Sequence, residues 1–339
     1  MPRPTTPTID RTTQLEAALS AWGPLAFDRG AYERFAADWA IEPGAEIPQA
    51  AALQHAVMFA LNAGPSAPPV TVEQVGDCGL NGSGYLRVAA VGGRQLKRGS
   101  KVAVIPIMGP VTPFQAPKWY AEFGIRVAAL PNIVTAARAA ANDPEVGRIV
   151  YAVHSPGGSA FGVGEAAAAL RDVSKAKPTA AAVTYLSASA AYWLSSTARE
   201  IVAAPSALVG SVGVRVTHMD VSKALEDMGI RMTELSMPAS KSDLSPYKPL
   251  SDTARAELMR TVEDIYGVFA ADISSARRID MAKDGDQYGR VHPASYAKSI
   301  GMVDRVATFE ALMVESAPAP DMTATRRARL AIMERQKRT

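Results

Sequence analysis

An uncharged run of small residues, TYLSASAAYWLSS at positions 184–196, contains the serine best placed for nucleophilic chemistry. The segment PTAAAVTY predicts a buried strand and SAAYWLSSTA predicts a helix, so Ser189 falls at the turn between them. A serine at such a turn presents its hydroxyl at a sheet edge, where the amide of Ala190 can help to hold an oxyanion. The alternative is a serine that only caps the helix, the commoner role of an isolated serine at a helix start. The G-x-S-x-G spacing is absent, which disfavours an α/β-hydrolase.

A glycine turn follows the preceding predicted strand. The segment RIVYAV predicts a buried strand that runs into SPGG, with Gly157 and Gly158, and then into a predicted helix. Glycines adopt backbone conformations closed to other residues and leave amide N–H groups bare near a helix start, where these can bind an oxyanion. A plain strand-to-helix turn is the alternative. No Gly-Lys-Ser/Thr follows, so the turn is not a phosphate-binding loop of that type.

A nucleophilic serine needs a base, and histidine is the first candidate. The chain has four histidines, and none stands in a context that singles it out: His55, His154, His218 and His292. His55 is expected to be structural, His154 ends a buried strand beside the glycine turn, and His218 could form a Ser-His pair with Ser189.

A lysine can also serve as the base, because desolvation disfavours the ammonium form and lowers a lysine pKa. The segment SMPASKSDLSPYKPLSD supplies Lys241 and Lys248 in a loop that precedes a long predicted helix. Solvent exposure is the default for a lone lysine in a loop.

Composition limits the classes of function. The 339 residues, 48% hydrophobic and 20% charged, indicate one or two globular domains. A net charge of +3 is too small to indicate nucleic-acid binding, and we do not expect a nucleic-acid partner. The single cysteine, Cys78, allows neither an intrachain disulfide nor a thiolate metal cluster. The Ala-rich region 178–194 is broken by threonines and serines, and the N-terminus has no apolar signal core, so we expect neither a membrane anchor nor export.

Hydrophobic patterning predicts an α/β fold with a largely parallel sheet covered on both faces, because strands and helices alternate from the segment KVAVIPI onward. Further strands are predicted near GSVGVRV and at IRMTELS, and a long helix begins near Ser251 or Asp252. The expected domain organisation is a disordered N-terminus (1–13), a helical region (14–75), a peptidase domain (76–316), and a linker with a basic tail (317–339). The tail has six basic residues between Arg326 and Thr339, which suggests either a solvated helix end or a docking segment.

Six motifs occur in one order: VAVIPIMGPV, DPEVGRIVYAVHSPGGS, KPTAAAVTYLSASAAYWLSSTAREIVA, GSVGV, SKSDLSPYKPLSD and GRVHPASYAKSIGMVD. From about residue 101 to residue 306 the chain resembles the protease IV / signal peptide peptidase A family of serine peptidases, especially its phage head-maturation (prohead protease) branch. The resemblance implies a ClpP/crotonase-like α/β fold with parallel βα repeats. It also implies endopeptidase activity without a metal or other cofactor, and ring-like homo-oligomers in which neighbouring subunits can complete the catalytic pair.

The resemblance assigns roles to individual residues. The nucleophile falls on Ser189 and the general-base lysine on Lys241, while Gly158 and the amide of Ala190 form the oxyanion hole. Lys248 lies after the PY pair and is the less favoured base. Bare strand edges near GSVGV are expected to bind an extended peptide by β-addition, and the Ala-rich wall favours small or apolar substrate side chains. The expected substrate-binding residues are Gly157, Gly210, Ser211, Val212 and Gly213.

The expected partners are a peptide or protein substrate, with phage scaffold or capsid proteins as candidates, and the expected location is the host cytoplasm or the phage prohead. Three alternatives stay open within the peptidase class or near it. They are a soluble cellular enzyme that degrades signal peptides, a Ser-His peptidase like the Clp proteolytic subunit with His218 as base, and a catalytically silent relative. A crotonase-like acyl-CoA enzyme would use the oxyanion hole without Ser189 as nucleophile.

Overall fold

The computed structural model describes residues 70–78, 81–91, 94–117, 120 and 125–316. These residues divide into two compact units: Val214–Tyr266 forms one, and the remaining described residues form the other, which holds the sheets. The expected N-terminal segments up to residue 69, His55 among them, and the predicted tail 317–339 lie outside the described residues.

The main sheet has the strand order β1-β2-β4-β7-β8-β10-β11, with β9 paired to β8. Its centre is parallel, since β4, β7 and β8 run in the same direction and β9 and β10 both pair parallel with β8. The prediction of an α/β fold with a largely parallel sheet is therefore confirmed. The strands are β1 (Val70–Val75), β2 (Tyr85–Val91), β3 (Arg94–Gln95), β4 (Lys101–Met108), β5 (Val111–Thr112), β6 (Ala128–Ala129), β7 (Val146–Ser155), β8 (Thr179–Ala188), β9 (Glu200–Ala203), β10 (Leu208–Gly210), β11 (Val291–Pro293) and β12 (Arg305–Val306).

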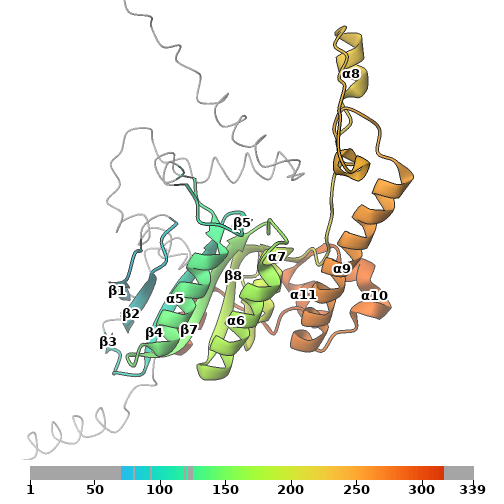
Figure 1. Ribbon diagram of the computed structural model, residues 1–339. Helices are drawn as coiled ribbons and strands as arrows, with labels where there is room; N and C mark the ends of the chain where they lie inside the picture. Colours follow the sequence, from blue (N-terminus) through green and yellow to red (C-terminus); the bar gives the residue numbers. More distant parts are fainter. Residues whose placement is uncertain (1–69, 79–80, 92–93, 118–119, 121–124, 317–339) are drawn as a thin grey trace, which may run out of the picture. The chain divides into compact units, whose positions relative to one another are not determined.

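Alanine-rich helices cover one face of the sheet. Helices α5 and α6 lie side by side across β4, β7 and β8 (Figure 1). Their buried alanines, such as Ala137 and Ala167, let helix and sheet backbones approach closely. The central strands read as nearly continuous apolar runs because both of their faces are buried. The helices are α5 (Leu130–Asn142), α6 (Val163–Ala176), α7 (Ala190–Ser196), α8 (Ser222–Asp227), α9 (Asp252–Arg277), α10 (Met281–Tyr288), α11 (Ala294–Ser299) and α12 (Phe309–Ser316), with a 3-10 helix at Ala239–Ser242.

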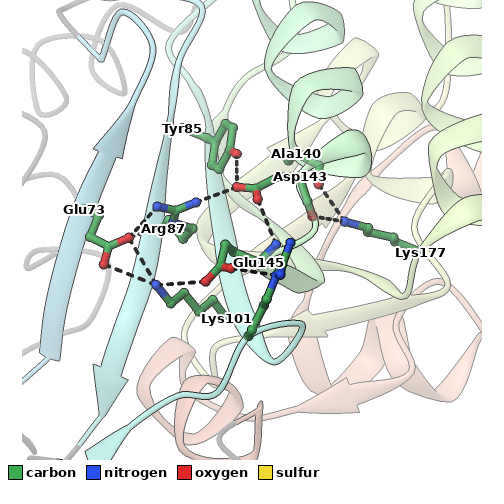
Figure 2. A network of polar contacts seen from close by, with 9 residues as sticks. Glu73, Tyr85, Arg87, Lys101, Ala140, Asp143, Glu145 and Lys177 are labelled. Carbon is green, nitrogen blue, oxygen red and sulfur yellow. Dashed lines mark hydrogen bonds and ion pairs between the residues drawn. The ribbon is translucent and has the colours of Figure 1, made fainter.

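A polar network joins the antiparallel end of the sheet to its parallel centre (Figure 2). The Tyr85 hydroxyl donates to Asp143 at 2.6 Å, and the Arg87 guanidinium pairs with both Asp143 and Glu73. Burial opposes the charge on Asp143, but these bonds and the backbone N–H of Glu145 together lower the pKa of its carboxyl. Because Glu73 lies on β1, the network fixes that strand to the rest of the sheet.

Two sequence predictions about secondary structure are wrong. Strand β1 occupies the last six residues of the segment predicted as helical, so the sheet begins before residue 76. A strand does lie near GSVGVRV as predicted, and it ends at Gly210. IRMTELS (230–236) is not a strand. Residues 230–236 are mostly exposed, and a strand needs a partner edge to satisfy its backbone groups. Within the described part of the chain, no helix is both long and apolar enough to span a membrane.

The unit Val214–Tyr266 contains α8, the 3-10 helix and the first part of α9. The predicted helix start is confirmed, since the Ser251 hydroxyl accepts the N–H of Ala254 at 3.2 Å. Several of the unit's apolar side chains are exposed, and Leu235 and Met237 are 94% and 91% accessible.

Candidate active site

Ser189 stands between β8 and α7, where the sequence predicts it. Its φ of 53° and ψ of −128° lie in a region that L-residues rarely adopt. Its backbone N–H donates to the Gly210 carbonyl at 2.9 Å, and its carbonyl accepts the N–H of Trp193 at 3.0 Å. The residue occupies the N-cap position of α7, yet its side chain makes no capping hydrogen bond. Ser189 is therefore a half-buried residue with a strained backbone, and its hydroxyl is not used as a helix cap.

The glycine turn lies directly against this serine. Gly157 has a φ of 90°, and a Cβ added to it would lie 2.7 Å from Cβ of Ser189 and 3.0 Å from the amide nitrogen of Ala190. Any side chain at Gly157 would therefore collide with the serine turn. The structure brings together three predicted site elements, the glycine turn, Ser189 and Ala190, at the carboxyl ends of β7 and β8.

Backbone hydrogen bonds hold the glycine turn from its other side. The N–H of Val111 donates to the Gly157 carbonyl at 2.7 Å, and the N–H of Ser159 donates to the Val111 carbonyl at 3.0 Å. A Cβ on Gly158 would overlap the Val111 carbonyl, so only glycine permits this close approach. Strand β5 thus fixes the glycine turn through backbone hydrogen bonds, and the motif SPGG alone does not predict that β5 is its partner.

Ser155 is a site residue that sequence reasoning missed. Its buried hydroxyl accepts the N–H of Gly157 at 3.2 Å. A serine hydroxyl often bonds to the backbone N–H two residues later in a turn, so the motif HSPGGS could have predicted this role for Ser155.

The segment after β10 differs from its prediction. Strand β10 pairs with β8 on one side and with β11 on the other, so Gly210 faces partners at both edges. The N–H groups of Ser211 and Val212 donate to the carbonyls of Arg290 and Tyr288 at 2.8 and 2.9 Å. The expected bare edge at this segment is therefore wrong for Gly210, Ser211 and Val212. Gly210 supports the serine turn instead, since its carbonyl accepts the Ser189 N–H.

Both candidate lysines lie in the unit Val214–Tyr266. Lys241 belongs to the 3-10 helix and is exposed, whereas Lys248 is half-buried and donates to the Ser242 hydroxyl at 3.0 Å. Gly213 ends the sheet-containing unit just before this one begins. Neither unit by itself contains both Ser189 and Lys241.

The described histidines occupy varied settings. His218 lies in the same unit as the lysines, with Nε2 3.0 Å from the Ser245 carbonyl oxygen. His292 places Nε2 2.7 Å from the Gln287 carbonyl oxygen, and the His154 ring meets that of Tyr185 edge-on. In the described ranges, no cluster of three or more histidine, cysteine or acidic residues could hold a metal ion.

Several known proteins that are similar to this chain are named as proteases. Residues 171–320 match the sequence model described as peptidase family S49. Protease 4 of Salmonella typhi is 32% identical over 177 residues, which cover 52% of this chain and 28% of that protein. Capsid assembly protease C of Escherichia phage lambda is 27% identical over 175 residues, which cover 52% of this chain and 40% of that protein. The chain thus spans less than half the length of these two relatives. The similarity to peptidase family S49 therefore extends over residues 171–320 of this chain.

Proposed function

We propose that this protein is a serine endopeptidase in which the Ser189 hydroxyl attacks the carbonyl carbon of a peptide bond. The observation that carries the proposal is the turn itself. Ser189 has a left-handed backbone, its hydroxyl does not cap α7, and the Gly157–Gly158 turn lies against it. Strained residues that the surrounding structure holds in place are typical of active sites.

The proposed mechanism is acyl transfer with Lys241 as the general base. Neutral Lys241 takes the hydroxyl proton as Ser189 Oγ bonds to the carbonyl carbon, and the amides of Gly158 and Ala190 stabilise the oxyanion. The C–N bond then breaks, and the leaving amine takes the proton from Lys241. Lys241 next takes a proton from water as the water oxygen bonds to the acyl carbon. The bond between that carbon and Ser189 Oγ then breaks, and Oγ regains its proton from Lys241. None of these steps requires a cofactor.

Lys241 must be desolvated to act as a neutral base, yet it is exposed in the single chain. We therefore include in the proposal a homo-oligomer in which a neighbouring subunit helps to bury the lysine and can share the catalytic pair. The exposed Leu235 and Met237 support this, because large exposed apolar side chains favour interaction surfaces. If the pair is shared, a mixture of Ser189→Ala and Lys241→Ala chains should recover activity that neither has alone. A strictly monomeric, fully active chain would refute this part.

The proposed substrate is an extended peptide with small or apolar side chains near the cut. An isolated β-bridge joins Val111 to Gly158. Phe114 and Phe161 each come three residues after one of these partners, and they are 78% and 69% accessible. They give an apolar surface near the glycine turn. The lambda relative is named a capsid assembly protease, which supports phage scaffold or capsid proteins as substrates in the host cytoplasm or prohead. Protease 4 supports the alternative of a cellular peptidase.

Substrate class is tested by co-expressing the chain with neighbouring capsid and scaffold genes. Shortening of those proteins that disappears with Ser189→Ala supports a maturation role. Degradation of apolar signal peptides, with capsid proteins left intact, favours the cellular alternative.

The catalytic assignment is tested with purified full chain and a fluorophosphonate probe. Ser189→Ala and Lys241→Ala should each abolish peptide cleavage, and wild-type labelling should map to Ser189. Lys248→Ala is the matched control, since it removes a second lysine of the same segment, and it should retain cleavage. Loss of activity in His218→Ala with full activity in Lys241→Ala would instead establish a Ser-His peptidase.

A further inference from the structure

Trp193 connects the serine turn to two other helices. It lies one helical turn after Ser189 in α7, and its indole stacks on Phe269 of α9 with ring centroids 4.4 Å apart and planes 8° apart. A Cβ added to Gly164, in the first turn of α6, would lie 3.6 Å from Cζ2 of this indole. The ring therefore lies against the start of the helix that follows the glycine turn.

One carboxylate on α9 holds this arrangement. The Trp193 Nε1–H donates to Oδ2 of Asp272 at 2.7 Å, and the Arg171 guanidinium of α6 pairs with the same oxygen at 2.9 Å. The Asp272 side chain is only 21% accessible, so these interactions are partly shielded from water. A single carboxylate oxygen thus links α7, which follows the serine, to α6, which follows the glycine turn.

We propose that Asp272 is a positioning residue for the peptidase reaction. By fixing the Trp193 indole and Arg171, it sets the position of Ser189 and the Ala190 amide relative to Gly157 and Gly158. The amides of Gly158 and Ala190 must both point at the substrate oxygen in the transition state. A small shift between α6 and α7 therefore weakens catalysis. The inference rests on the proposed function, and Asp272 itself touches neither the substrate nor the reacting atoms.

The first test compares substitutions at Asp272. In Asp272→Ala we expect kcat per active site to fall about 10- to 100-fold, with KM changed less than about twofold. Asp272→Asn keeps an oxygen that accepts the indole N–H, so it should recover most of the lost rate. Asp172→Ala is the matched control, because it removes a carboxylate from an exposed ion pair with Lys175 on α6, and its kcat should match wild type. A fall in melting temperature without a fall in kcat per active site would overturn the proposal.

The second test uses Trp193→Phe, which keeps a ring for the Phe269 stack but removes the N–H donor. It should lose as much kcat as Asp272→Ala, and the double variant should lose no more than either single variant. Additive losses would show that the two residues act separately and would refute the link.

Hydrogen exchange separates this inference from the proposed function. In Asp272→Ala the amides of residues 157–164 and 190–193 should exchange faster than in wild type and in Asp172→Ala. Unchanged exchange at both segments would overturn the positioning role whatever the activity. If wild-type chain shows no Ser189-dependent cleavage or labelling, the proposed function falls, while the exchange result still decides whether Asp272 holds the two helices together.

Discussion

Replacing Gly157 by alanine tests the geometry on which the proposed oxyanion hole depends. The residue has a φ of 90°, a conformation that costs an L-residue about 1–3 kcal/mol. The new Cβ would lie 2.7 Å from both Ser189 Cβ and the Ala188 carbonyl oxygen, so the turn must shift. A shifted turn moves the Gly158 amide away from the oxyanion, and loss of one such donor costs about 100- to 1000-fold in kcat.

The assay measures kcat on an apolar peptide, with active sites counted by a fluorophosphonate, together with urea unfolding. Gly267→Ala is the matched control, since this glycine lies in α9 with no atom near a Cβ position. The control should retain kcat and gain about 0.5–1 kcal/mol in the free energy of unfolding, because alanine favours helix. If Gly157→Ala keeps kcat within about threefold of wild type, contrary to the donor-loss estimate, the close approach of the two turns is not needed for catalysis.

Three further changes have defined outcomes. Asp143→Ala leaves the Tyr85 hydroxyl without its partner and should lower the free energy of unfolding by about 3 kcal/mol at pH 7. Because the folded-state pKa of Asp143 is lowered, wild type loses this stability as pH falls through that pKa. Urea titrations should therefore show a smaller difference in unfolding free energy between wild type and Asp143→Ala at pH 3 than at pH 7. An equal difference at the two pH values would contradict the pKa argument. Ser155→Ala removes the acceptor for the Gly157 N–H and should lower kcat about tenfold with little change in KM, whereas an unchanged kcat in steady-state assays would count against its support of the turn. Phe161→Ser should raise KM for apolar peptides several-fold with kcat retained, and equal KM values would remove this side chain from substrate binding.

Local patterns in the sequence were sufficient to place the site on the fold. Apolar runs predicted β7 and β8, and the segment of small residues after the second run predicted α7. Ser189 and the glycine turn could therefore be assigned to the same sheet edge. Such predictions succeed because hydrophobic periodicity reflects burial within one element. The same reasoning failed at 230–236, where alternation predicted a strand and the structure has none, because a pattern within one segment does not show whether a partner strand lies beside it.

The sequence by itself determined the α/β order, the serine turn, the glycine turn and the long helix α9, since each depends on residues close together in the chain. Only the tertiary structure decided the partners that hold these pieces. Val111 clamps the glycine turn, β11 closes the edge of β10 that was expected to be free, and Asp272 bonds to Trp193. These contacts join residues many positions apart, and they follow from the packing of whole elements, which no local periodicity encodes.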